Sequence, residues 1–273
     1  FFLILLHGFN HGSDSEDWFI RGVYLAFLVG IMIGLIYRTT YKIRQRSNRF
    51  TVKELRWETK DTFTLILKQH KKIRFDAGQF CFLRLNKEKL YARHPFTISS
   101  SPDDEYLSFT IKLQGRFTKT ASQIKEGEEV IIEGPFGTFT IEDDKKDLVL
   151  LAGGVGITPF MSIIKDHLDK DKKRKMTLLY GSRKKEEIIF KDELDKIDEG
   201  WFTKKYVLSE DDCEDEAYEK GYIDISLIKK HIKDIHDARF YICGPAGMKE
   251  SLKKALIGSG VKKQDIMIED FFW

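Results

Sequence analysis

The sequence predicts three parts in order: a membrane helix or helix pair, an antiparallel β-barrel and an α/β domain with a parallel sheet. Residues 18–38 form an apolar run about as long as a bilayer core requires, roughly 20 residues. Short alternating apolar stretches separated by turn residues fill 51–133. From 147 onward, strand and helix patterns alternate, which is typical of a parallel sheet. The expected boundaries are 1–47, 48–143 and 144–273.

The elements expected in the barrel and in the α/β domain follow from these periodicities. The barrel strands are Thr51–Glu58, Thr62–Gln69, Gln79–Leu85, Pro95–Ser100, Tyr106–Leu113 and Glu129–Glu133, with a short helix at Thr118–Ile124. The parallel strands are Asp147–Ala152, Met176–Tyr180, Trp201–Leu208, Arg239–Cys243 and Asp265–Glu269. The helices between them are Pro159–Asp169, Phe190–Ile197, Ile225–Ile235 and Ala246–Leu256.

Composition excludes some functional classes. The 273 residues carry 46 basic and 43 acidic side chains, so the net charge of +3 gives no indication of nucleic-acid binding. The cysteines are Cys81, Cys213 and Cys243. An odd and sparse set is not a disulfide framework, which favours a reducing compartment for most of the chain.

Charges flank the apolar run asymmetrically. Asp14, Glu16 and Asp17 precede it, whereas Arg38 and Lys42 begin a basic segment after it. A signal peptide would carry its positive charges before the apolar run. The positive-inside rule therefore predicts a membrane protein whose barrel and α/β domain lie in the cytoplasm.

The first residues suggest a second membrane segment. Residues 1–9 are apolar and read as the end of an earlier helix, followed by a loop at 10–17 and the helix at 18–44. His7 then lies within or at the edge of the membrane, where an ionisable side chain is a functional candidate. An interfacial histidine with no ligand is the alternative, and the pattern alone leaves both open.

The first parallel strand runs into the segment GGVGITP. Gly153, Gly154 and Gly156 allow positive φ and close approach of a ligand to the backbone. Thr158 suits an N-cap and Pro159 the first helical position. The N-terminus of the following helix would then form an anion site suited to a pyrophosphate. The alternative is a tight strand–helix turn without a ligand.

The second strand ends in YGSRKKEE. In dinucleotide-binding folds an arginine here accommodates the phosphate of NADP, and an acid favours NAD. Ser182 and Arg183 come first and favour NADPH, whereas Glu186 and Glu187 keep NADH possible.

The fourth predicted strand ends in CGPAGM. Cys243 would face the same crevice as the glycine segment, with Gly244 in the turn and Pro245 at the helix start. Buried cysteine is commonly just a small hydrophobe, which is the alternative.

Taken together, the motifs resemble the ferredoxin–NADP reductase superfamily over roughly 50–273. They are AGQF (77–80), RHPFTISS (93–100), QGRFTKT (114–120), GPFG (134–137), GGVGITP (153–159), YGSR (180–183), CGPAGM (243–248) and an aromatic C-terminus. Each motif is short, but their order and spacing are specific. The resemblance implies that the barrel binds FAD and the α/β domain binds NADPH, with NADH possible.

The resemblance also implies site residues. Cofactor-binding positions in the barrel are Arg93, His94, Pro95, Phe96, Thr97, Ser99, Ser100, Lys112, Gly115, Arg116, Phe117 and Thr118. Those in the α/β domain are Gly153, Gly154, Gly156, Thr158, Pro159, Ser182, Arg183, Cys243, Gly244, Pro245, Met248 and the terminal Trp273. Catalytic roles fall on Thr97 near flavin N5, Cys243 near the nicotinamide, Glu269, and Trp273, which stacks on the flavin and must move to admit nicotinamide.

The form HPFT is typical of the membrane branch of this superfamily, the NADPH oxidases and ferric reductases. Soluble members usually carry Arg where this chain has His94. HGF after an apolar run resembles a haem-ligand segment, which implies His7 as a ligand of haem b iron. The overall resemblance is to bacterial NADPH oxidases of the streptococcal type, shortened at the N-terminus.

This resemblance implies electron flow from NADPH through FAD and haem to oxygen, producing superoxide. A ferric or other metal reductase with the same electron path is the first alternative, and a membrane-tethered flavin sensor without turnover is the second. No motif indicates a protein activator.

Trp273→Ala is expected to speed nicotinamide access or to increase the use of NADH, because it removes the ring that the resemblance places over the flavin. Stopped-flow flavin reduction measures this directly. Unchanged kinetics with both nucleotides would contradict the gating role.

Overall fold

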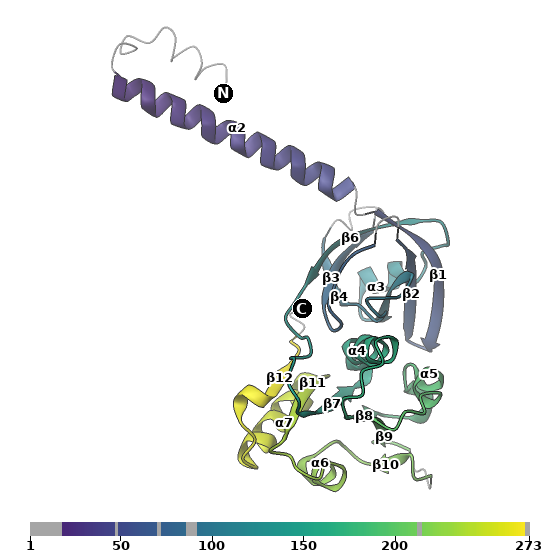
Figure 1. Cartoon of the computed structure of the whole chain (residues 1–273). Coiled ribbons are helices and arrows are strands. Elements are labelled where there is room, and N and C mark those ends of the chain that lie inside the picture. The colour runs from purple at the N-terminus through teal and green to yellow at the C-terminus, as the bar shows by residue number, and fades with distance from the viewer. Residues whose placement is uncertain (1–17, 47–48, 70–71, 86–91, 212–214, 271–273) are drawn as a thin grey trace. The chain divides into compact units, whose positions relative to one another are not determined.

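The computed structural model describes residues 18–46, 49–69, 72–85, 92–211 and 215–270 (Figure 1). The chain divides into two compact units, Phe1–Arg49 and Phe50–Trp273. Both predicted sheets lie in the second unit. The predicted boundary between barrel and α/β domain remains a prediction.

The first unit contains one described helix, α2 (Trp18–Arg46). Its segment Arg21–Thr40 is long and apolar enough to cross a membrane by length and composition, and its side chains are not buried inside the protein. The hydroxyls of Thr39 and Thr40 donate to the carbonyls of Leu35 and Ile36 at 2.8 and 2.9 Å, which satisfies them within the helix. The helix runs two residues beyond its predicted end at 44.

The second unit begins with a six-stranded antiparallel sheet in the order β4-β3-β6-β1-β2-β5. Its strands are β1 (Arg49–Thr59), β2 (Thr62–Lys68), β3 (Phe80–Leu85), β4 (His94–Thr97), β5 (Tyr106–Lys112) and β6 (Glu129–Phe136). An isolated bridge between Ile98 and Phe109 links the two ends of this order, so the sheet curls back on itself (Figure 1). Helix α3 spans Arg116–Ala121, two residues earlier at its start than predicted.

The core of this sheet comes from one face of each strand. Phe63, Leu65 and Leu67 alternate along β2, and Leu65 pairs with Phe109 of β5. All four side chains are fully buried. This period of two is what the alternating sequence predicted.

A six-stranded parallel sheet follows, in the order β10-β9-β8-β7-β11-β12. Its strands are β7 (Asp147–Gly153), β8 (Met176–Ser182), β9 (Phe202–Leu208), β10 (Tyr218–Lys220), β11 (Ala238–Cys243) and β12 (Ile266–Ile268). Strand β10 was not predicted, because three residues carry too little periodicity. The order reverses between β7 and β11, which makes their carboxyl ends the place where such sheets bind ligands.

Helices cover both faces of this sheet. They are α4 (Thr158–Asp169), α5 (Lys191–Asp195), α6 (Ile225–His231) and α7 (Ala246–Gly258), with 3-10 turns η1 (Gly154–Ile157), η2 (Lys185–Glu187) and η3 (Lys263–Asp265). Leu148 and Leu150 of β7 belong to one core and Val149 and Leu151 to the other. Strands buried on both faces explain the continuous apolar run in the sequence.

The predicted cap of α4 was wrong by one residue. Ile157 occupies the N-cap position with helical backbone angles, and Thr158 is already in the helix. The Thr158 hydroxyl donates to the Val155 carbonyl at 2.7 Å. The 3-10 turn runs directly into α4, so no residue there has the extended conformation of an ordinary N-cap.

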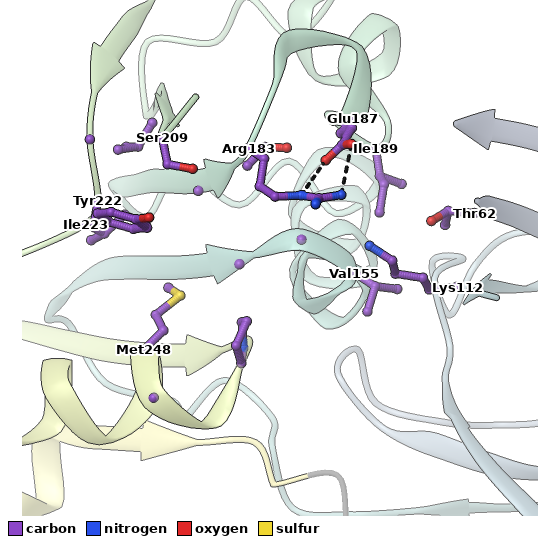
Figure 2. A pocket seen from close by; sticks show the side chains of 18 of the residues that line it. Thr62, Lys112, Val155, Arg183, Glu187, Ile189, Ser209, Tyr222, Ile223 and Met248 are labelled. Carbon is purple, nitrogen blue, oxygen red and sulfur yellow. Dashed lines mark hydrogen bonds and ion pairs between the residues drawn. The ribbon is translucent and has the colours of Figure 1, made fainter. Parts of the chain in front are cut away.

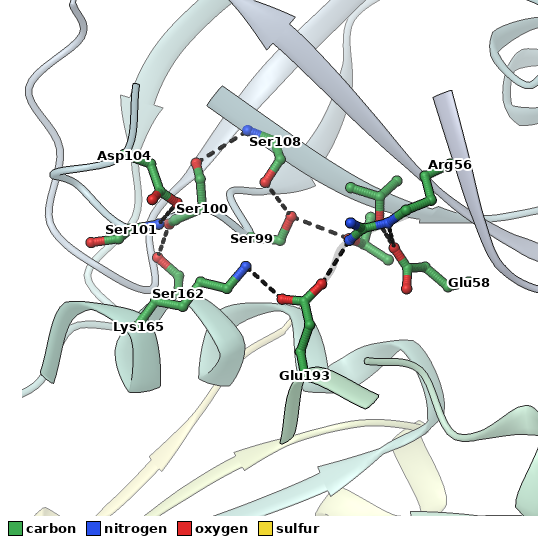
Figure 3. A network of polar contacts seen from close by, with 12 residues as sticks. Arg56, Glu58, Ser99, Ser100, Ser101, Asp104, Ser108, Ser162, Lys165 and Glu193 are labelled. Atoms are coloured by element: carbon green, nitrogen blue, oxygen red, sulfur yellow. Dashed lines mark hydrogen bonds and ion pairs between the residues drawn. The ribbon is translucent and has the colours of Figure 1, made fainter. Parts of the chain in front are cut away.

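Polar contacts join the two sheets within the second unit (Figure 3). The Ser162 hydroxyl of α4 donates to the Ser100 carbonyl at 2.7 Å. Glu193 of α5 accepts from Arg56 of β1 at 2.7 Å and from Lys165 of α4 at 2.9 Å. These contacts hold α4 and α5 against the first sheet.

Leu65→Ala is expected to lower the free energy of unfolding by about 2 to 5 kcal/mol, because it opens a cavity in the first core. Urea unfolding of the full chain, followed by tryptophan fluorescence, measures the change. Leu168→Ala is the control, since Leu168 is 36% exposed and should change stability by only about 0.5 kcal/mol. Equal effects would contradict the assigned core.

Candidate functional site

A cavity of about 250 Å³ opens against the first sheet. Its walls are His94–Thr97 of β4, the end of β5, and the loop and start of α3 at 114–118. Val155 of η1 and Thr158 of α4 reach the same cavity from the segment after β7. The cavity therefore lies between the first sheet and this segment, and it gathers most of the barrel positions that the sequence assigned to cofactor binding.

Aromatic rings stack in this wall. The centre of the Phe117 ring lies 4.0 Å from that of His94 and 5.7 Å from that of Phe96, with interplanar angles of 28° and 20°. Burial lowers the pKa of His94, so its imidazole is neutral at pH 7. A neutral, flat wall of this kind suits a planar aromatic ligand.

The hydroxyl of Thr97 has no hydrogen-bond partner among the described residues, although the side chain is only 4% exposed. Buried hydroxyls nearly always have a partner. Thr97 lines the cavity, so the free hydroxyl fits a bound group with a polar edge.

The loop before α3 and the start of this helix contain Gly115, Arg116 and Thr118, three of the positions that the sequence assigned to cofactor binding. Gly115 has φ +149° with open space where a Cβ would lie, and the neighbouring Arg116 is exposed. The Thr118 hydroxyl donates to the Gly115 carbonyl at 3.1 Å and accepts from the Gln114 N–H at 2.8 Å. Thr118 thus closes the loop, and Gly115 and Arg116 remain open to a ligand.

Three assigned residues lie outside this cavity lining. The Ser99 hydroxyl bonds with those of Ser108 at 3.0 Å and Thr110 at 3.1 Å, and the Ser100 hydroxyl accepts from the Ser108 N–H. Arg93 pairs with Glu133 at 3.2 Å. It lines a neighbouring cavity that also contains Glu269.

A second cavity of about 540 Å³ lies at the carboxyl ends of the parallel strands (Figure 2). Its lining includes Gly153, Gly154, Val155, Ser182, Arg183, Pro245 and Met248 from the sequence motifs. Lys112 and Thr62 reach it from the first sheet. Val155 and Lys112 line both cavities, so the two cavities are adjacent.

The glycines of the GGVGITP segment serve two purposes. A Cβ on Gly156 would lie 2.3 Å from the Cys243 carbonyl oxygen, and one on Gly153 would lie 2.6 Å from the Met248 sulfur. These two glycines allow the segment to pack against the turn after β11. Gly154 has φ +54° with open space beside it, and it is the glycine that exposes backbone to the cavity.

Cys243 is the last residue of β11 and Glu269 directly follows β12, and these strands are neighbours because Ile242 pairs with Ile268. Burial raises the pKa of the Cys243 thiol, which is therefore protonated and inert as a base. Burial, and then the nearby Asp270 carboxylate, raises the pKa of Glu269 to about 7. Glu269 can exchange a proton near neutral pH.

Two other residues that the sequence assigned to cofactor binding, Pro159 and Gly244, are closely packed against neighbouring parts of the protein. Pro159 is buried in α4, and a Cβ on Gly244 would lie 3.1 Å from the backbone of Gly153. Trp273 and His7 lie outside the described residues. Within the part of the chain that the structure describes, no group of three or more His, Cys, Asp or Glu could hold a metal ion.

Sequence reasoning missed part of the second cavity. Tyr222 and Ile223 line it together with Met248, and Tyr222 is 81% exposed. They follow Gly221, which has φ +109°, directly after the short strand that was not predicted. The segment GYI was the available signal, but only the fold brings it to the cavity.

Two family models match the chain. The FAD-binding domain covers residues 47–140, and the oxidoreductase NAD-binding domain covers residues 150–254. A ferredoxin NADP⁺ reductase from Neisseria gonorrhoeae with bound FAD and NADP shares the fold, with a TM-score of 0.72 and 23% identity over 82% of this chain and 98% of that one. The two family models together cover most of this chain, which therefore combines an FAD-binding domain with an oxidoreductase NAD-binding domain, and its fold is that of the ferredoxin NADP⁺ reductase. The chain is by family an FAD-dependent NAD(P)H oxidoreductase.

Further comparisons find similarity to parts of two other kinds of enzyme. The FAD/NAD-binding domain of a nitric oxide dioxygenase from Vibrio cholerae has a TM-score of 0.74, at 22% identity over 82% of this chain and 98% of that one. One component of the Na⁺-translocating NADH-quinone reductase of Neisseria meningitidis is 34% identical over 165 residues, 58% of this chain. The match spans only about 40% of that relative.

FAD fits the first cavity on two observations, the unpartnered Thr97 hydroxyl and the open backbone at Gly115. Thr97→Val is expected to leave the stability of the FAD-free protein unchanged or higher, because a buried hydroxyl without a partner is unfavourable. The same variant should weaken FAD binding by about two- to tenfold, the loss expected for one hydrogen bond.

Fluorescence titration with FAD and thermal unfolding of the full chain measure the two effects. Thr97→Ser is the control, since it keeps the hydroxyl. FAD affinity in Thr97→Val equal to that of the wild type would show that the hydroxyl does not contact the cofactor.

Proposed function

We propose that this protein takes electrons from NAD(P)H onto FAD and passes them to an acceptor at the membrane, with oxygen as the final acceptor, as a superoxide-producing NADPH oxidase does. The observation that carries the first step is the adjacency of the two cavities, which share Val155 and Lys112. A flavin in one and a nicotinamide dinucleotide in the other would therefore lie close together.

FAD, when bound, accepts hydride from the nicotinamide and can release electrons singly. The chain supplies placement and a suitable environment. Thr97 offers a hydroxyl in the first cavity, and the backbone around Gly154 offers N–H groups at the start of η1 and α4. Cys243 stays neutral beside these loops, and Glu269 can hold or release a proton near pH 7. The roles of these residues are part of the proposal.

The membrane step is supported by α2 and by the sequence. Arg21–Thr40 can span a bilayer by length and composition, and the basic residues after it favour a cytoplasmic position for the flavin unit. The HPFT segment at 94–97 supports the membrane branch of the superfamily.

Haem b remains an expectation from His7, which lies outside the described residues. Helix α2 contains no histidine in its sequence. Helix α2 thus offers no histidine ligand for haem.

Two other electron acceptors are compatible with the same transfer of electrons from NAD(P)H to FAD. A ferric or other metal reductase would use the same two cavities. A quinone acceptor is favoured by one observation, the 34% identity to a component of Na⁺-translocating NADH-quinone reductases. A sensor without turnover would not require a second cavity beside the first, so the adjacency of the two cavities favours turnover.

We expect that anaerobic mixing of the FAD-loaded full chain with NADPH or NADH bleaches the flavin absorbance rapidly. Stopped-flow spectroscopy measures the rate for each nucleotide, and FAD-loaded protein mixed with buffer alone is the control. No bleaching with either nucleotide, despite bound FAD, would remove the reductase function and favour the sensor.

The acceptor can be tested on the same reduced protein. Oxygen should reoxidise the flavin with cytochrome c reduction that superoxide dismutase suppresses. Faster reoxidation by a ferric chelate or by a soluble quinone, with no superoxide, would replace the oxidase by the corresponding reductase.

A further inference from the structure

Arg183, the residue expected to bind the phosphate of NADPH, is already engaged. Its Nε and Nη2 donate to the two carboxylate oxygens of Glu187 at 3.0 Å each (Figure 2). This bidentate pair takes two of the five N–H donors of the guanidinium and places a carboxylate charge directly against it. The Lys60 ammonium, from the turn after β1, lies 3.3 Å from the same carboxylate.

Glu187 is the more enclosed partner of this pair. Its side chain is 12% exposed, against 56% for Arg183. Both residues line the second cavity, as does Ser209 at the end of β9 (Figure 2). The carboxylate is therefore part of the cavity wall.

The remaining charges of the cavity are also balanced. Among the lining residues that the structure describes, the cations are Lys112 and Arg183 and the anions are Asp61 and Glu187. Lys112 pairs with Asp61 at 3.2 Å. Lys185 is turned elsewhere, with its ammonium 5.1 Å from the centre of the Tyr218 ring. Each cation of the lining thus has its own carboxylate.

This balance disfavours a phosphate and favours a ribose diol. The 2′-phosphate of NADPH carries close to two negative charges, and it would meet described lining side chains that carry no net positive charge, with the guanidinium of Arg183 already neutralised by Glu187. A ribose hydroxyl can instead donate to a carboxylate, which is how acidic residues select NADH in dinucleotide folds.

We propose that Glu187 determines the donor of this protein, by occupying Arg183 and by accepting from the adenosine ribose, so that NADH is preferred over NADPH. The inference rests on the proposed nicotinamide site and names its substrate. It reverses the preference that Arg183 suggested in the sequence, because the charge of the arginine is already neutralised by a carboxylate in the same cavity wall.

Glu187→Gln tests the proposal on the FAD-loaded full chain. Glutamine keeps the shape but releases Arg183, and it leaves no buried cation unpaired because Arg183 is exposed. The ratio of the second-order rate constants for flavin reduction, NADPH over NADH, is expected to rise by about tenfold or more, as for one charge-assisted hydrogen bond gained.

Glu186→Gln is the matched control. It makes the same change in charge at the adjacent residue, which is exposed and does not line the cavity. Its ratio should stay within about twofold of the wild type. In the double variant Arg183→Ala with Glu187→Gln, the NADPH-over-NADH ratio should return to that of the wild type, because the increase in Glu187→Gln requires the guanidinium of Arg183. An unchanged ratio in Glu187→Gln, or a gain that survives in the double variant, overturns the proposal.

A binding measurement separates this proposal from the proposed function. Calorimetric titration of the full chain with AMP and with 2′-phospho-AMP reports the adenosine site without turnover. Glu187→Gln should tighten binding of 2′-phospho-AMP and not of AMP. If the variant binds 2′-phospho-AMP more tightly but neither nucleotide reduces the flavin, the proposed reductase function is wrong and the role of Glu187 stands. If the flavin is reduced but the affinity for 2′-phospho-AMP does not change, or if neither compound binds, the proposed role of Glu187 is wrong.

Discussion

The close approach of two loops at the centre of the parallel sheet is the constraint on which the site depends. The segment after β7 lies against the turn after β11, so tightly that a Cβ on Gly156 would lie 2.3 Å from the Cys243 carbonyl oxygen. Backbone atoms cannot yield as a flexible side chain can, so glycine is required there. Val155 and Thr158 reach the cavity of the first sheet only because this packing fixes the segment between them.

The second constraint is the attachment of α4 and α5 to the curled sheet. Strand β4 carries the unpartnered Thr97 hydroxyl, and three residues later the Ser100 carbonyl accepts from Ser162 of α4. The ion pairs of Glu193 with Arg56 and Lys165 add a second point of contact. Partly exposed ion pairs contribute little stability individually. Their effect here is to orient the sheets, so that the two cavities share a wall.

The described lining of the second cavity is close to electrically neutral. The cations of the second cavity are paired with carboxylates, burial lowers the pKa of His94, and burial raises the pKa of the Cys243 thiol. In the second cavity, backbone N–H groups at loops such as that of Gly154 suit the anionic parts of a ligand, because the start of a helix favours negative charge.

The sequence alone determined much of this protein. Alternation with period two placed β1, β2 and β5, and buried apolar runs placed β7, β8 and β11, because those patterns reflect burial on one or two faces of a sheet. The order of short motifs was enough to indicate FAD and a nicotinamide dinucleotide. The length and flanking charges of the segment around 21–40 were enough to indicate a candidate membrane helix.

Tertiary structure decided what depends on side chains that are distant in the sequence or on the exact path of the backbone. It showed that Thr158 follows a 3-10 turn rather than capping a helix, that Thr118 closes its own loop, and that Ser99 and Ser100 bond inside the barrel. A motif shows which residues are present. Whether their polar groups can contact a ligand depends on the partners that the fold brings to them. Arg183 is the clearest case, since its identity suggested a phosphate, whereas the fold places the Glu187 carboxylate against two of its donors and neutralises its charge.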